Sequence, residues 1–230
     1  MVYITGDKHA DFSEVFDFCY ENKTTLKDIL IVLGDAGINY YTNEKDYILK
    51  NSLLQYPITF FCIHGNHEER PENIKTYKTK KFHNGIVYYE EEYPNLLFAK
   101  DGEIYHFNHH KVLVIGGAYS IDKYFRLARG YNWYESEQPS EQAKCRIKKV
   151  LKNLDYKIDV ILSHTCPYKY LPREMFLGGI DQSTVDNSTE YFLDEIEDIT
   201  DYKLWYCGHH HTDKEIDKVI FMFHKIEEFK

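Results

Sequence analysis

The sequence is poor in the features that mark membrane proteins and disulfide-bonded proteins. No apolar run approaches the ~20 residues that a membrane-spanning helix requires. The 5 cysteines contain no Cys-x-x-Cys pair, and their odd number excludes complete internal pairing. The chain enters a predicted strand almost at once, so we expect no signal peptide before it. Together these absences favour a reducing, cytoplasmic setting.

The chain also lacks an excess of positive charge. Its 28 Lys and Arg residues are outnumbered by 37 Asp and Glu residues, which gives a formal net charge of −9. Because affinity for duplex nucleic acid comes mainly from neutralised phosphates, we do not expect duplex binding to be the main role. A phosphorylated substrate is compatible with this charge if bound metal cations supply positive charge locally.

The composition that is present predicts a globular protein. Hydrophobic residues make up 43% and charged residues 28% of the chain, which excludes intrinsic disorder. A chain of this length can bury roughly 70% of its unfolded surface without help from disulfides. We find no internal repeat, low-complexity linker or break in composition, so we predict a single domain over residues 1–230.

The first quarter of the chain alternates predicted strands and helices. Apolar strands are expected at residues 2–5, 29–33 and 58–63, and helices at residues 13–22 and 43–54. Such a βαβαβ order predicts a parallel sheet with right-handed crossovers. The polar stretch that follows, residues 69–81, is expected to be a surface excursion.

The rest of the chain mixes hairpins with further α/β units. Turn residues such as Asn84-Gly85, Pro94-Asn95 and Asp101-Gly102 separate short apolar segments, which predicts antiparallel hairpins. The expected strands are residues 86–89, 96–98, 103–107, 111–115, 158–162, 204–207 and 219–223, and the expected helices are residues 140–154 and 190–199. The predicted fold class is therefore α/β.

Metal-ligating residue types follow five of the predicted strands directly. These places are Gly6-Asp7-Lys8-His9, Gly34-Asp35, Gly65-Asn66-His67-Glu68, Ser163-His164 and Gly208-His209-His210-His211. Ligands gather at the carboxyl ends of strands in α/β sheets, so five such ends can meet at one place. Carboxylate, imidazole and amide donors together suit Mn²⁺, Fe²⁺ or Zn²⁺, and the number of donors is about enough for two ions.

Each motif alone has an ordinary structural explanation. An Asp after Gly is common in turns, and an Asn at the start of a helix is a common cap. The combination of all five motifs, each after a buried strand, is what predicts a metal site.

The five blocks resemble those of the calcineurin-like metallophosphoesterase superfamily, which run D-x-H, G-D, G-N-H-[DE], H and G-H-x-H. The resemblance extends from Asp7 to His211. It implies a four-layer α/β/β/α sandwich of two mixed sheets, with a dinuclear metal centre at the carboxyl ends of the strands. It implies two metal positions and a shared bridge: Asp7, His9 and His211 for the first, Asn66, His164 and His209 for the second, and Asp35 between them.

The resemblance also implies a reaction. A metal-dependent phosphoesterase of this family hydrolyses a P–O bond by attack of a metal-bridging hydroxide on phosphorus. His67 would assist the leaving group, and Asp35 would act with it in catalysis. The substrate would be a small phosphorylated or nucleotide-like monoester or diester, and the cofactors two divalent ions, Mn, Fe or Zn.

One block departs from the protein phosphatase branch of the family. That branch reads GDxxDRG, where the later Asp orients the catalytic histidine and the Arg grips phosphate. Asp35 is followed here by Ala-Gly-Ile-Asn, so both of these groups are missing. We therefore do not expect protein phosphatase activity. The Gly116–Asp122 stretch resembles uncharacterised bacterial and phage members. The residues beyond it mix cations with aromatic residues and are expected to be loop-like, and three of them are candidates for substrate binding: Arg126, Arg129 and Trp133. The alternative is that these arginines are solvated or paired with nearby acids.

Two other functions compete with a small-molecule phosphoesterase. A nuclease acting on short or single-stranded nucleic acid is the alternative enzyme, and a catalytically silent scaffold that binds proteins is the alternative outside enzymes. Three acids near the last two blocks are candidates to accept hydrogen bonds from ligand histidines: Asp181, Asp186 and Asp213. The sequence is silent on the oligomeric state.

Overall fold

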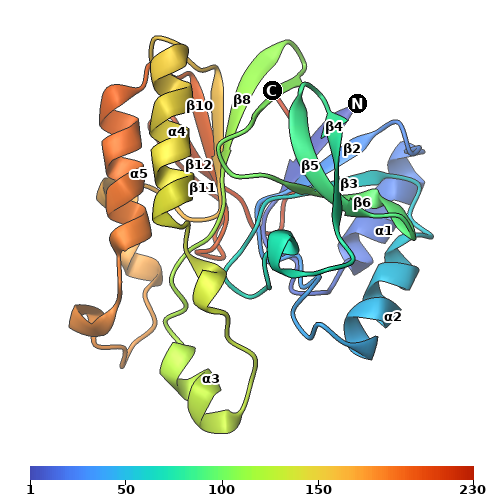
Figure 1. Ribbon diagram of the computed structural model, residues 1–230, viewed down its shortest axis with the longest axis horizontal. Helices are drawn as coiled ribbons and strands as arrows, with labels where there is room; N and C mark the ends of the chain where they lie inside the picture. Colours follow the sequence, from blue (N-terminus) through green and yellow to red (C-terminus); the bar gives the residue numbers. More distant parts are fainter.

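The computed structural model describes all 230 residues and has two β-sheets packed face to face (Figure 1). The first sheet has 7 strands in the order β13-β1-β2-β3-β6-β5-β4. Its strands β1, β2, β3 and β6 are parallel, and the strands beyond them at both edges are antiparallel. The bounds are β1 (Val2–Thr5), β2 (Ile29–Val32), β3 (Thr59–Cys62), β4 (Lys78–Phe82), β5 (Gly85–Glu90), β6 (Tyr93–Ala99) and β13 (Glu227–Glu228).

The second sheet has 6 strands in the order β11-β12-β10-β9-β8-β7. Strands β8, β9, β10 and β12 are parallel, and the outermost strand on each side pairs antiparallel with its neighbour. The bounds are β7 (Ile104–Phe107), β8 (His110–Ile115), β9 (Val160–Ser163), β10 (Leu204–Cys207), β11 (Lys214–Ile216) and β12 (Val219–Phe221).

Helices cover the outer face of each sheet. The first sheet is covered by α1 and α2 and the second by α4 and α5, whereas α3 projects away from both sheets (Figure 1). The helices are α1 (Ser13–Asn22), α2 (Glu44–Leu53), α3 (Lys123–Arg129), α4 (Glu141–Asn153) and α5 (Ser188–Ile199), and the short 3₁₀ helices are η1 (Pro71–Asn73), η2 (Glu135–Glu137), η3 (Tyr168–Tyr170), η4 (Arg173–Met175) and η5 (Gln182–Thr184). None of the helices combines the length and apolar character needed to cross a membrane.

The central strands are apolar throughout because both of their faces are covered. In β2, Ile29 and Ile31 face the second sheet, while Leu30 and Val32 pack with Val15 of α1. Alternate side chains of one strand therefore enter two different cores, as expected for a strand buried on both faces. The α/β/β/α order of four layers predicted from the sequence is confirmed.

Two helices begin with a side chain that caps their first turn. The Ser140 hydroxyl accepts a hydrogen bond from the backbone N–H of Ala143 at the start of α4, and the Asn43 side chain accepts one from Lys45 at the start of α2. Each side chain satisfies a backbone donor that the first turn of a helix leaves without a partner.

Three local predictions were wrong. Residues 78–82 form β4 rather than a surface excursion, and as an exposed edge strand rich in Lys it carries no apolar pattern. Pro94 and Asn95 lie inside β6 rather than in a turn, because a Pro is tolerated near the start of a strand and beside the bulge at Tyr89. The stretch around Arg126 is not loop-like but forms α3.

Candidate metal centre

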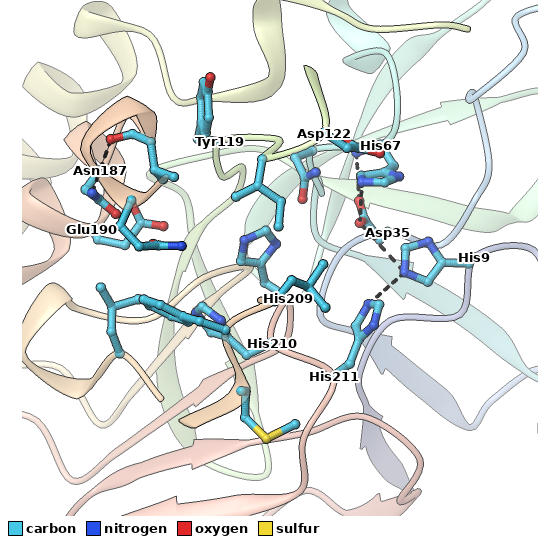
Figure 2. A pocket seen from close by; sticks show the side chains of 18 residues that line it. His9, Asp35, His67, Tyr119, Asp122, Asn187, Glu190, His209, His210 and His211 are labelled. Atoms are coloured by element: carbon cyan, nitrogen blue, oxygen red, sulfur yellow. Dashed lines mark hydrogen bonds and ion pairs between the residues drawn. The ribbon is translucent and has the colours of Figure 1, made fainter. Parts of the chain in front are cut away.

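The predicted metal ligands lie together at one end of the two sheets. Asp7 follows β1 and Asp35 follows β2, whereas Asn66 follows β3. His164 follows β9 and His209 follows β10, so both sheets contribute side chains (Figure 2). The two carboxylates are almost fully buried, with exposed fractions of 3% and 2%. Parallel strands deliver these residues to the same edge, as the sequence predicted.

Three side chains form a first group of possible ligands. Nε2 of His211 lies 3.3 Å from Oδ2 of Asp7, and Nε2 of His9 lies 3.8 Å from the same oxygen. The two imidazole nitrogens are 2.9 Å apart. One ligand atom from each of the three residues falls within 4.8 Å of the others, which is the spacing that a single bound cation would need.

A second group surrounds His164. Its Nε2 lies 2.8 Å from Oδ1 of Asn66 and 3.7 Å from Oδ1 of Asp35. The imidazole of His209 packs beside it, with ring centroids 5.0 Å apart. Oδ2 of Asp35 is also 4.0 Å from Nε2 of His9, so Asp35 lies between the two groups. This position suits a carboxylate shared by two cations.

The polar partners of these residues turn their ligand atoms toward one another. The Leu33 carbonyl lies 2.7 Å from Nδ1 of His164, so Nδ1 donates to it and Nε2 faces Asn66 and Asp35. The Asn66 amide donates to Oγ of Ser120, which leaves its carbonyl oxygen pointing to His164. Burial lowers the pKa of His209 well below its usual value, so the ring is neutral, as a metal ligand must be.

One buried oxygen favours nearby positive charge. Oδ2 of Asp7 is fully buried and faces Nε2 of His211 at 3.3 Å without a well-formed hydrogen bond, while Oδ1 accepts the backbone N–H of His209. A buried carboxylate oxygen with so little hydrogen bonding is costly unless positive charge compensates for it. The donor set of oxygens and imidazoles therefore fits divalent metal ions.

Glycines let the ligand-bearing segments approach this closely. Gly34 has φ +98°, and a Cβ there would lie 2.1 Å from Nδ1 of His164. A Cβ on Gly208 would lie 2.3 Å from Oδ1 of Asp7. Any larger residue at either position would displace a predicted ligand.

His67 contacts an arginine that comes from a distant part of the chain. Nη2 of Arg126 lies against Nδ1 of the His67 ring and 3.2 Å from Nε2. Arg126 is only 8% exposed, and its Nε donates to Oδ2 of Asp122 over 2.7 Å. Its Nη1 also donates to the Asn132 carbonyl and lies 3.3 Å from the Tyr40 hydroxyl. Arg126 therefore connects Asp122 to His67, a contact that the sequence did not reveal.

The other two candidates for substrate binding lie away from the cavity beside the metal ligands. Trp133 donates its Nε1–H to Glu137 over 2.8 Å, and Nζ of Lys123 lies 4.0 Å above its ring. The Arg129 guanidinium is exposed and packs over the ring of Phe125, 5.4 Å from its centroid.

The three acids proposed to support the ligand histidines make other contacts. Asp181 caps Ser183, and Asp186 accepts from Gln138 and Ser188. The third, Asp213, accepts the backbone N–H of Phe223. The expectation for these three was wrong because short polar loops let Asp residues bond to nearby backbone.

A cavity of about 390 Å³ opens beside the metal ligands. Its far wall comes from residues 171–187 and includes Leu171, Phe176 and Val185. Sequence reasoning missed this wall, although apolar residues scattered through a turn-rich segment between two ligand blocks were a signal for it. Glu190 and His210 complete the cavity (Figure 2). A cleft of this size suits a small molecule.

A protein-family model, described as calcineurin-like phosphoesterase, matches residues 1–213. The match covers most of the chain, so the chain belongs to this family. No curated protein matches the chain. Membership supports a metal-dependent phosphoesterase in general, and the clustered carboxylates and imidazoles supply candidate ligands for its divalent ions.

Proposed function

We propose that this member of the calcineurin-like phosphoesterase family hydrolyses small phosphate monoesters or diesters with two divalent metal ions, Mn, Fe or Zn. The observation that supports it most is the convergence of seven predicted ligand side chains, Asp35 among them, after five strand ends. The first ion would be held by Asp7, His9 and His211, and the second by Asn66, His164 and His209, with Asp35 shared. When bound, such a pair of ions neutralises phosphate charge and activates water for in-line displacement.

His67 is the residue we assign to the leaving group. A guanidinium can only donate hydrogen bonds, so the Nδ1 atom that Arg126 contacts must accept one. A neutral ring then carries its proton on Nε2, which lies 4.0 Å from Oδ2 of Asp35 and borders the cavity. From there the Nε2–H would donate a hydrogen bond to the ester oxygen and stabilise the negative charge that develops on it as the P–O bond breaks.

Arg126 is assigned to positioning rather than to binding phosphate. Its guanidinium is buried and occupied by Asp122, Asn132 and His67, and it does not line the cavity. We propose that it takes the place of the acid that orients this histidine in the protein phosphatase branch. The tight cavity and the absence of a phosphate-gripping Arg in the second block both favour small substrates over phosphoproteins and nucleic acid duplexes.

The test is hydrolysis of p-nitrophenyl phosphate and bis-p-nitrophenyl phosphate by protein stripped of metal and reloaded with Mn²⁺. We expect turnover of at least one ester and about two bound ions per chain by elemental analysis. Asp35→Asn should remove turnover and one ion while leaving the circular dichroism spectrum unchanged. Asp17→Asn, on the exposed surface of α1, is the matched control.

The results also separate the competing functions. Two bound ions without turnover of either ester would reject hydrolysis and favour a silent scaffold. Preference for the diester with cleavage of short single-stranded oligonucleotides would favour a nuclease. Near-normal activity of Asp35→Asn would contradict the shared role of this carboxylate.

A further inference from the structure

The cavity continues well beyond the side chains assigned to the metal ions. His9, His67 and His211 lie at one end, and Glu190 and Asn187 lie at the opposite end (Figure 2). Much of the remaining lining is apolar and comprises Ile121, Leu171, Met175, Phe176, Leu177 and Val185. A phosphate ester bound at the metal end would therefore place its organic group against this wall.

The cavity contains no side chain that could neutralise a second phosphate. None of its 18 lining residues is Lys or Arg, and the lining includes the acids Asp122 and Glu190. The guanidinium of Arg126 does not line the cavity, because it is buried against His67. A diphosphate or triphosphate would place negative charge against apolar and acidic side chains, so the organic group should carry no further phosphate.

Glu190 presents an unsatisfied hydrogen-bond acceptor at the far end. It is 4% exposed, and its Oε1 accepts the hydroxyl of Thr165 over 2.9 Å. Nε2 of His210 lies 3.4 Å from that hydroxyl, so the donors of this short chain can all point toward Glu190. Its other oxygen, Oε2, has no partner and is covered by the surrounding side chains, so a ligand donor would reach it when one of these side chains moves aside.

A hydrogen-bond donor on the bound substrate would give Oε2 the partner that it lacks. Burial raises the pKa of Glu190 to about 7, and a hydrogen bond to Oε2 would favour the ionised form. Apolar walls with one well-placed polar group are typical of sites that fix the orientation of a small organic molecule.

We propose that Glu190 and the apolar wall form a subsite for the organic group of a single-phosphate ester, and that this group offers an N–H donor to Oε2. The phosphate end of this inference rests on the proposed function. The donor is either the neutral amino group of a heterocycle such as a nucleobase, or a charged ammonium.

The experiment compares matched ligands that cannot be hydrolysed. Calorimetry on Mn²⁺-loaded protein gives the Kd of the 5′-phosphonate of adenosine and of purine riboside, which lacks only the amino group. A second pair, 3-aminopropylphosphonate and butylphosphonate, tests an ammonium in the same way. We expect the N–H member of one pair to bind about tenfold more tightly, the size of one good hydrogen bond.

The variant Glu190→Gln tests whether the preference for the N–H ligand depends on Oε2 of Glu190. The amide oxygen can still accept from Thr165, and the amide nitrogen then replaces Oε2 by a donor, so the preference should fall to about one. Glu195→Gln on the same helix is the matched control, because Glu195 is exposed and pairs only with Lys148. The comparison of each ligand pair in the native protein needs no variant, so it tests the proposal even if Glu190→Gln does not fold.

Each outcome decides the proposal. Equal affinities within both pairs, or a preference that persists in Glu190→Gln, would overturn it. A preference within the first pair identifies a heterocyclic amino group, and one within the second identifies an ammonium. A Glu190-dependent preference in a protein that hydrolyses neither p-nitrophenyl ester would support the subsite and reject the proposed hydrolysis instead.

Discussion

The pair of Arg70 and Asp101 allows a quantitative test of what holds the loops beside the metal centre. Nη1 of Arg70 donates to Oδ2 of Asp101 over 2.7 Å, and its Nε donates to the Ser136 carbonyl. Oδ1 of Asp101 accepts the backbone N–H of Gly116. Because Arg70 is 8% and Asp101 5% exposed, water cannot replace these contacts.

The expected cost follows from burial and distance. At 2.7 Å and an effective dielectric constant of about 20, the attraction between the two charges is about 6 kcal/mol. Part of it offsets the desolvation of both groups, but removing one partner leaves the other charge buried, which costs about 3–5 kcal/mol. Asp101→Asn keeps an oxygen for Gly116 and removes the charge, so we expect a loss near 3 kcal/mol in the free energy of unfolding.

Urea unfolding followed by circular dichroism measures this loss through the midpoint and the m-value. Glu195→Gln, which breaks an exposed pair with Lys148, should cost less than about 1 kcal/mol. Adding Arg70→Met to Asp101→Asn should cost less than the sum of the single changes, because no charge is then left unpaired. A loss below 1 kcal/mol for Asp101→Asn would refute the reasoning that this pair is effectively shielded from water.

Three further predictions concern the metal ions, His67 and helix α4. Removing metal with a chelator should lower the midpoint temperature of thermal unfolding, because an ion at 100 times its Kd stabilises the fold by about 2.7 kcal/mol. Scanning fluorimetry with and without Mn²⁺ measures this midpoint, and equal midpoints would contradict metal binding to the folded state. Arg126→Leu should lower kcat about 10²-fold with little change in KM, because His67 loses its positioning contact. Arg129→Leu, the exposed control on the same helix, should stay within about twofold in steady-state assays, and similar losses in both variants would argue against positioning. Ser140→Ala should cost about 1 kcal/mol in urea unfolding, because Ala143 loses its capping partner; no change would mean that water replaces the cap.

The parts of the fold that the sequence predicted are those where periodicity and burial agree. β2, β3 and β9 are short apolar segments followed by Gly or polar candidate ligands. The sequence therefore indicated both that they are strands and that they run parallel to their neighbours. β4 and α3 could not be inferred, because each is exposed at an edge of the molecule and carries no apolar pattern that its position requires.

The same distinction applies to the candidate site. Side chains such as Asp7, Asp35 and His164 follow strands whose carboxyl ends must meet, so topology alone brings them together. The Arg126 contact with His67 joins residues 59 positions apart and depends on how α3 is placed relative to His67. No local spacing encodes that placement, which is why Arg126 and Arg129 were equivalent candidates in the sequence.

The strand ends and the segments between them contribute different parts of the candidate site, which explains how one arrangement of predicted ligands can serve different substrates. Five strand ends fix the predicted metal ligands, and their positions tolerate little change, since even a Cβ on Gly34 or Gly208 would collide with His164 or Asp7. The far wall of the cavity comes instead from residues 171–187, which form short 3₁₀ turns and are mostly exposed. Sequence change in that segment would alter the organic group that fits without moving the metal ligands. Substrate preference should therefore depend on this segment and on Glu190 just beyond it, and chemistry on the strand ends.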